Sequence, residues 1–133
     1  MLKKFTNKKG FTLMEMLIVV AIIAILVAIA IPTFKSSMDK ANAATDLANI
    51  RSGYAQAQIK AMTENLPNGT ELVLQKNGTV DTTGSSDYVC KGSSANADGL
   101  NDFAGGSLTV SWAAGDSIKY TINDGKVGSI AKK

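Results

Sequence analysis

The sequence has no histidine and a single cysteine, Cys90. Histidine is the commonest general base and, with cysteine, the usual zinc ligand, so its absence argues against a Ser-His-Asp site and a zinc site. A lone cysteine forms no internal disulfide, and we interpret Cys90 as a small, half-buried hydrophobic side chain. The sequence also lacks a glycine-rich phosphate loop and any recognisable pair of catalytic carboxylates. These absences argue against an enzyme, and we expect no cofactor.

Aromatic residues are scarce, at 6% of 133 residues, so any globular core beyond the first helix must be small. The net charge of +3 comes from the first ten residues, which hold four of the 14 basic residues. The rest of the chain has 10 basic against 11 acidic residues, a net charge of −1. No basic patch remains there, and we therefore predict no nucleic-acid partner.

One long apolar stretch dominates the N-terminal quarter of the chain. From Phe11 to Phe34 the only charged residue is Glu15. As a helix this stretch would be about 36 Å long, enough to cross a hydrocarbon core of roughly 30 Å. Lysines precede it and none follows until its end, which predicts a cytoplasmic N-terminus.

Three interpretations of this stretch are open on composition alone. A secretory signal peptide fits the basic start and the Ala41-Asn42-Ala43 site, although the apolar run is longer than usual and the site lies beyond Pro32. A plain single-pass anchor explains the length but gives Glu15 no role. In the third, Glu15 needs a cationic partner once it is buried, because an unpaired carboxylate in an apolar medium is costly. An interfacial position for Glu15 would lower that cost.

The segment Lys8-Lys9-Gly10-Phe11-Thr12-Leu13-Met14-Glu15 resembles the cleavage motif of type IV pilins and of type II secretion pseudopilins. In that family a short basic leader ends in glycine, phenylalanine usually follows, and a glutamate lies four residues after it. Pro32 lies where many pilins have a helix-kinking proline. The resemblance covers residues 1–60 and is weak beyond them.

The resemblance implies processing and assembly. A membrane peptidase would cut between Gly10 and Phe11 and methylate the new amino group of Phe11. Glu15 would then pair with the amino group of a neighbouring subunit, and Pro32 would kink the helix. The implied partners are further copies of the chain in a helical filament, the prepilin peptidase, an assembly platform and minor pilins, with the membrane as the location before assembly.

Beyond Pro32, apolar residues recur every three or four positions, which predicts the buried face of a helix that continues to about residue 65. This stripe consists of Leu47, Ile50, Tyr54, Ala57 and Ala61. Charged residues of the same stretch, Asp46 and Arg51 among them, are expected elsewhere on the helix. Gly53 is expected to loosen it.

The C-terminal half carries β patterns and turn signals, notably Asn77-Gly78 and Asn123-Asp124-Gly125. The predicted strands are residues 71–76, 107–112, 117–122 and 127–130, with residues 88–90 as a short strand or docking segment in an exposed loop region. We predict an α+β fold of the pilin lollipop type. It consists of a long N-terminal helix, half of it protruding, and a small antiparallel sheet packed on its C-terminal half. The expected segments are a leader at 1–10, a transmembrane or filament-core helix at 11–34, an amphipathic helix at 35–65, and loops and sheet at 66–133.

Two weaker signals lie in the C-terminal half. Asp98, Asn101 and Asp102 supply oxygen ligands that could bind calcium, but their spacing fits no defined calcium loop, and turn chemistry explains them equally. Trp112 and Tyr120 alternate with polar residues along predicted strands, which favours core positions over a sugar-binding patch. Many Gram-negative pilins close a C-terminal loop with two cysteines, and this chain departs from that pattern.

The favoured function is that of a structural subunit of a type IV pilus, polymerised through its N-terminal helix for adhesion, twitching motility or DNA uptake. The expected location is a single-pass inner or cytoplasmic membrane segment before assembly and an extracellular filament afterwards. One alternative is a pseudopilin of a type II secretion or competence system. Another is a membrane-anchored extracytoplasmic binding module that forms no polymer.

Overall fold

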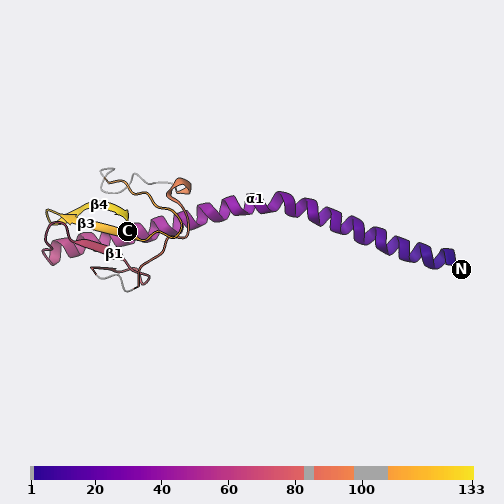
Figure 1. Ribbon diagram of the computed structural model, residues 1–133, viewed down its shortest axis with the longest axis horizontal. Coiled ribbons are helices and arrows are strands. Elements are labelled where there is room, and N and C mark those ends of the chain that lie inside the picture. The colour runs from indigo at the N-terminus through magenta and orange to yellow at the C-terminus, as the bar shows by residue number, and fades with distance from the viewer. Residues whose placement is uncertain (1, 83–85, 98–107) are drawn as a thin grey trace. The chain divides into compact units, whose positions relative to one another are not determined.

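The computed structural model describes residues 2–82, 86–97 and 108–133, with side chains from residue 12 onward. Its longest element is helix α1, Leu2–Thr63 (Figure 1). Internal contacts divide the chain into two units, Met1–Ser37 and Met38–Lys133. The described residues of the first unit are all helical, whereas those of the second combine the rest of α1 with the strands.

Within the first unit the helix continues through Pro32 without a break in its assignment. Proline has no N–H, so the bond that residue 32 would donate to the carbonyl of Ala28 is missing. Next to it, the Thr33 hydroxyl donates to the carbonyl oxygen of Ile29 at 3.1 Å, a side-chain bond of a type that often accompanies a bend. The kink at Pro32 stays a prediction.

In the second unit, α1 buries the face that the sequence predicts. Of the five stripe residues, Leu47, Ile50, Ala57 and Ala61 are buried, and Tyr54 packs partly buried against the same core. The helix ends at Thr63, and Asn65 follows with a φ of 50°. A left-handed residue at this position is a common helix stop.

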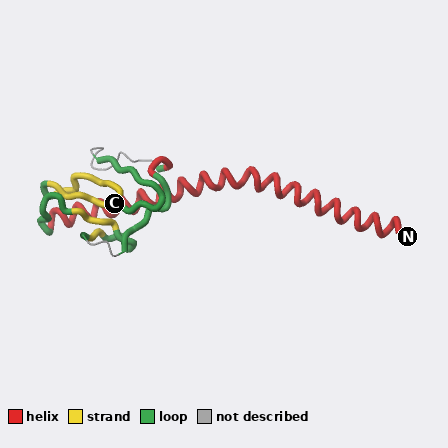
Figure 2. Tube along the Cα trace, in the orientation of Figure 1, coloured by secondary structure: helices red, strands yellow, loops and turns green. Residues whose placement is uncertain are grey.

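The sheet has four antiparallel strands in the order β2-β1-β3-β4 (Figures 1 and 2). The strands are β1 Glu71–Leu74, β2 Val80–Asp81, β3 Ile118–Asn123 and β4 Lys126–Lys132. Its buried face packs against α1, with Tyr120 of β3 at the centre, opposite Leu72 of β1 and Ile130 of β4. The predicted α+β fold, with an antiparallel sheet on the C-terminal half of a long helix, is therefore confirmed.

Both predicted hairpins are present. Leu74 pairs with Val80 across the Asn77-Gly78 turn, where Gly78 has a φ of 86°. Between β3 and β4 the two-residue loop Asp124-Gly125 has φ values of 54° and 75°. Positive φ at both loop positions defines a type I′ turn, whose twist suits two adjacent strands.

Tyr120 has no exposed surface, and its hydroxyl donates to the carbonyl oxygen of Ile50 in α1 at 2.6 Å. This approach depends on Gly53, because a Cβ there would collide with the Tyr120 hydroxyl and lie 2.8 Å from Cδ1 of Leu74. Gly53 therefore provides space for the sheet, and α1 runs through it without interruption. The expectation that Gly53 loosens the helix stays a prediction.

The strand predicted at residues 107–112 is wrong, because the described part of it, from Leu108 onward, forms no strand. The alternation of apolar and polar residues did predict burial correctly, since Val110 and Trp112 are both buried. The backbone of Trp112, however, bonds to Ser94: its N–H donates to Ser94 Oγ at 3.2 Å, and its carbonyl accepts from the Ser94 N–H at 3.0 Å. Ser94, the first residue of the short 3-10 helix Ser94–Asn96, thus takes the bonds that a neighbouring strand would have used.

Candidate functional site

The apolar stretch forms an exposed helix. Every side chain from residue 12 to residue 38 is exposed, including Leu17 at 65%, Ile25 at 62% and Phe34 at 67%. Soluble monomers rarely expose an apolar surface of this extent, which usually marks a contact with membrane or protein. Within the described residues, one helix is long and apolar enough to cross a membrane, by length and composition alone.

Glu15 is the only charged side chain in this stretch, and it is exposed like its neighbours. Gly10 and Phe11 precede it within the helical backbone of α1. The helix places Glu15 four residues, about one turn, after Phe11. A carboxylate is thus positioned within one helical turn of the amino group that cleavage after Gly10 would create.

The calcium candidates Asp98, Asn101 and Asp102 lie outside the described residues. Among the described residues, no group of three or more His, Cys, Asp or Glu side chains is arranged to hold a metal ion.

The second unit contains a buried charged side chain that sequence reasoning placed incorrectly. Asp46 has no exposed surface, although it was expected away from the buried face of the helix. It lies three residues after Ala43 and four before Ile50, both of which are fully buried. This spacing could have predicted the burial of Asp46 from the sequence, since positions three and four apart share one face of a helix.

Four hydrogen-bond donors converge on the carboxylate of Asp46. The Tyr88 hydroxyl donates to Oδ1 at 2.7 Å, and the Trp112 indole Nε1 donates to Oδ2 at 3.1 Å. The backbone N–H groups of Lys91 and Gly92 donate at 2.9 Å to Oδ1 and at 2.7 Å to Oδ2. Hydrogen bonds to an ionised group are among the stronger hydrogen bonds in proteins. The four bonds to Asp46 together offset the free-energy cost of burying its charge.

This cluster ties two loops to α1 and changes the acidity of its neighbours. Burial, together with the hydrogen bond to Asp46, raises the pKa of Tyr88 to about 12. Burial and the nearby charge of Asp46 likewise raise the pKa of the Cys90 thiol to about 12. Cys90 is 2% exposed, more deeply buried than the sequence suggested, and a thiol of this kind is unreactive at neutral pH. The cluster is therefore a structural anchor.

Trp112 and Tyr120 occupy core positions, as predicted. The segment Tyr88–Cys90 docks onto the sheet, since the Tyr88 N–H donates to the carbonyl of Leu74 at 2.8 Å. The Cys90 N–H donates to the carbonyl of Asp116, also at 2.8 Å.

Comparison with known proteins finds one family model and one curated relative. Residues 5–31 match the family model of the prokaryotic N-terminal methylation motif. Over 56 residues the chain is 52% identical to the type IV narrow pilus major component PilA5 of Thermus thermophilus, a match that covers 40% of this chain. The match covers 48% of PilA5, so the chain spans about half the length of this curated relative. No solved structure matches the chain significantly.

Proposed function

We propose that the chain is a structural subunit that polymerises into a type IV pilus, because residues 5–31 match the prokaryotic N-terminal methylation motif and the chain is similar to a type IV pilus component. The observation that carries this proposal is the exposed apolar helix directly behind Gly10-Phe11, with Glu15 as its only charge from residue 12 to residue 34. PilA5, whose name describes a major pilus component, supports the same function.

Processing would precede assembly. The proposed peptidase cuts between Gly10 and Phe11 on the cytoplasmic side and methylates the amino group of Phe11. Glycine leaves the scissile bond unobstructed, and its backbone leaves the helical conformation at little cost. The helix is kept and holds the subunit in the membrane until assembly.

Assembly would transfer the helix from lipid to contacts with other copies. Because lipid is already apolar, this transfer gains little from the hydrophobic effect, and packing and polar contacts must supply the specificity. The pairing of Glu15 with the α-amino group of Phe11 in a neighbouring subunit provides such a contact. An unpaired carboxylate in that interior would be strongly unfavourable, so the pair would also define the register of the subunits.

The proposed roles of the filament are adhesion, twitching motility or DNA uptake, and its proposed partners include an assembly platform and minor pilins. The described fold has features compatible with exposure on a filament, namely the exposed polar residues of the two hairpin loops, Asn77, Thr79, Asn123 and Asp124.

The test is mass spectrometry of material sheared from the cell surface. We expect a chain that begins at Phe11 and is heavier by about 14 Da, the mass of one added methyl group. A processed chain that stays in the membrane fraction would favour a pseudopilin. A chain that still begins at Met1, or that begins near Ala44, would contradict the proposal.

A further inference from the structure

Asp46 lies near the point where α1 enters the core of the second unit. Every side chain from residue 12 to residue 38 is exposed, and the first buried side chains after them are those of Ala43 and Asp46. Here a loop lies directly on the helix, because a Cβ atom on Gly92 would be 2.6 Å from the backbone nitrogen of Ala43. Ala43 and Asp46 therefore mark the N-terminal end of the buried contact between α1 and the rest of the second unit.

The loop that supplies three of the four donors to the carboxylate of Asp46 is itself attached to the sheet. The Tyr88 N–H donates to the carbonyl oxygen of Leu74, the last residue of β1, at 2.8 Å. Two residues later, the Cys90 N–H donates to the carbonyl oxygen of Asp116, which precedes β3 by two residues, at 2.8 Å. Hydrogen bonds therefore connect the carboxylate on α1 to segments that continue into β1 and β3.

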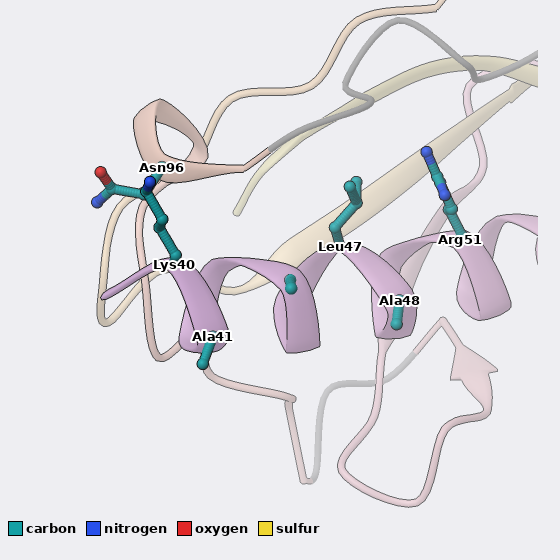
Figure 3. A pocket seen from close by; sticks show the side chains of 7 residues that line it. Lys40, Ala41, Leu47, Ala48, Arg51 and Asn96 are labelled. Carbon is teal, nitrogen blue, oxygen red and sulfur yellow. The ribbon is translucent and has the colours of Figure 1, made fainter. Parts of the chain in front are cut away.

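Open space remains beside α1 where this loop approaches it. A cleft of about 470 Å³ is lined by Asn96 on the loop and by helix residues that include Ala44 and Ala48 (Figure 3). Ser94, two residues before Asn96, bonds instead to the backbone of Trp112, whose indole donates to the carboxylate on α1. Polar bonds, and not close packing alone, therefore hold the loop to the helix.

The contacts between α1 and the sheet differ in how they oppose sliding. The core contacts are apolar, and the hydrophobic effect is non-directional. Hydrogen bonds, in contrast, weaken steeply when their geometry is distorted. The Tyr120 hydroxyl donates one such bond to the Ile50 carbonyl oxygen at 2.6 Å, and the Val127 N–H donates one to Oε1 of Gln58 at 2.9 Å. Asp46 concentrates four bonds on one ionised acceptor, and bonds of that type are roughly twice as strong as neutral ones.

We propose that Asp46 and its donors from Tyr88, Lys91, Gly92 and Trp112 form a mechanical clamp that keeps the sheet attached to α1 under tension. The inference rests on the proposed function, in which the apolar helix is held by other copies while adhesion or motility loads the folded unit. Tension then passes from the sheet to the helix, and this cluster joins the two at the N-terminal end of their buried contact.

The position of the cluster along α1 makes the clamp directional. Load that enters the second unit at residue 38 reaches Asp46 before it reaches Ile50 and Gln58. Load that enters at Glu64, beyond the other end of the helix, reaches Gln58 first. A clamp at Asp46 therefore resists pulling from residue 38 more than pulling from residue 64. A residue that only raises the free energy of unfolding affects both directions alike.

The test is single-molecule pulling on the full chain in detergent. One handle is attached at Ser129→Cys on β4 and the other at Met38→Cys or at Glu64→Cys, all exposed positions, whereas Cys90 is buried. Asp46→Asn keeps the shape of the side chain, removes its charge and replaces one acceptor oxygen by a donor. We expect this change to raise the rate of forced unfolding at constant load at least about tenfold with handles at 38 and 129. With handles at 64 and 129 the rate should rise much less.

Ile122→Val is the matched control, because it removes a buried methyl group outside the cluster and should raise the rate by similar factors in both directions. If Asp46→Asn does not fold, Tyr88→Phe removes a single donor and should show the same asymmetry with a smaller rise. Equal rises in the two directions, or no rise in either, would overturn the clamp. The measurement uses single chains, so its outcome does not depend on filament formation, and the proposed function stands or fails separately by the mass of the sheared material.

Discussion

The indole nitrogen of Trp112 donates a hydrogen bond to the carboxylate of Asp46, which lies 66 residues earlier in the chain. Both side chains are buried, so the bond joins the helix to a loop inside the core. Tyr88 and the backbone of Lys91 and Gly92 complete the set of donors. One carboxylate thus holds three separate segments together.

Asp46→Ala should destabilise the second unit substantially. Four donors lose their acceptor in a buried site, and unsatisfied buried groups of this kind cost about 3 kcal/mol or more in total. Guanidinium unfolding followed by Trp112 fluorescence measures the loss. Glu64→Ala removes an exposed carboxylate and should change stability by less than about 0.5 kcal/mol. Equal stabilities for the two variants would contradict the role assigned to Asp46.

Gly53→Ala should destabilise the protein, although alanine normally stabilises a helix by about 1 kcal/mol relative to glycine. The added Cβ collides with the Tyr120 hydroxyl, and overpacking of this kind costs about 1–3 kcal/mol. Tyr120→Phe removes that hydroxyl, so the double variant should lose less than the sum of the two single variants. A double-mutant cycle by chemical denaturation checks this, and simple additivity would refute the steric explanation.

The second unit should lose stability in alkali. Cys90 and Tyr88 have folded-state pKa values of about 12, against ordinary values of 9.0 and 10.0. The folded state therefore keeps its protons to higher pH than the unfolded state. The stability contributed by these groups is fully present below about pH 9 and is lost as the pH rises to about 12.

Unfolding curves between pH 8 and pH 12 measure this dependence. Tyr88→Phe removes one of the two groups and should flatten the alkaline loss. An unfolding midpoint that does not change over the whole range would contradict the prediction.

Glu15→Val should leave cleavage intact and strongly reduce filament yield, because it removes the proposed partner of the α-amino group. Mass spectrometry of the membrane fraction reports cleavage, and electron microscopy of sheared material reports filaments. Met16→Val, a change at the adjacent apolar position, serves as the control. Normal filaments from Glu15→Val would exclude the pairing.

Gly10→Val should block cleavage and retain the uncut precursor in the membrane. The bulky β-branched side chain obstructs the proposed scissile bond and disfavours a change of backbone conformation next to it. An immunoblot that separates precursor from processed chain checks this result. Processing at the normal rate would place the cleavage site elsewhere.

The sequence by itself determined the features that depend on neighbouring residues. The apolar run with its single glutamate predicts an exposed helix for membrane or filament, and the spacing from Leu47 to Ala61 predicts the buried stripe. Asn77-Gly78 and Asp124-Gly125 predict the hairpins, because a turn depends on the φ preference of its own residues.

Tertiary structure alone decided the features that depend on distant residues. The burial of Asp46 requires donors that lie 42 to 66 residues away. The need for glycine at position 53 follows from the close approach of the Tyr120 hydroxyl. The backbone of Trp112 bonds to Ser94 and not to a neighbouring strand. Local patterns report which side chains are apolar. They do not report which distant polar groups will meet inside the core, and those long-range hydrogen bonds determine where a charged or alternating segment lies.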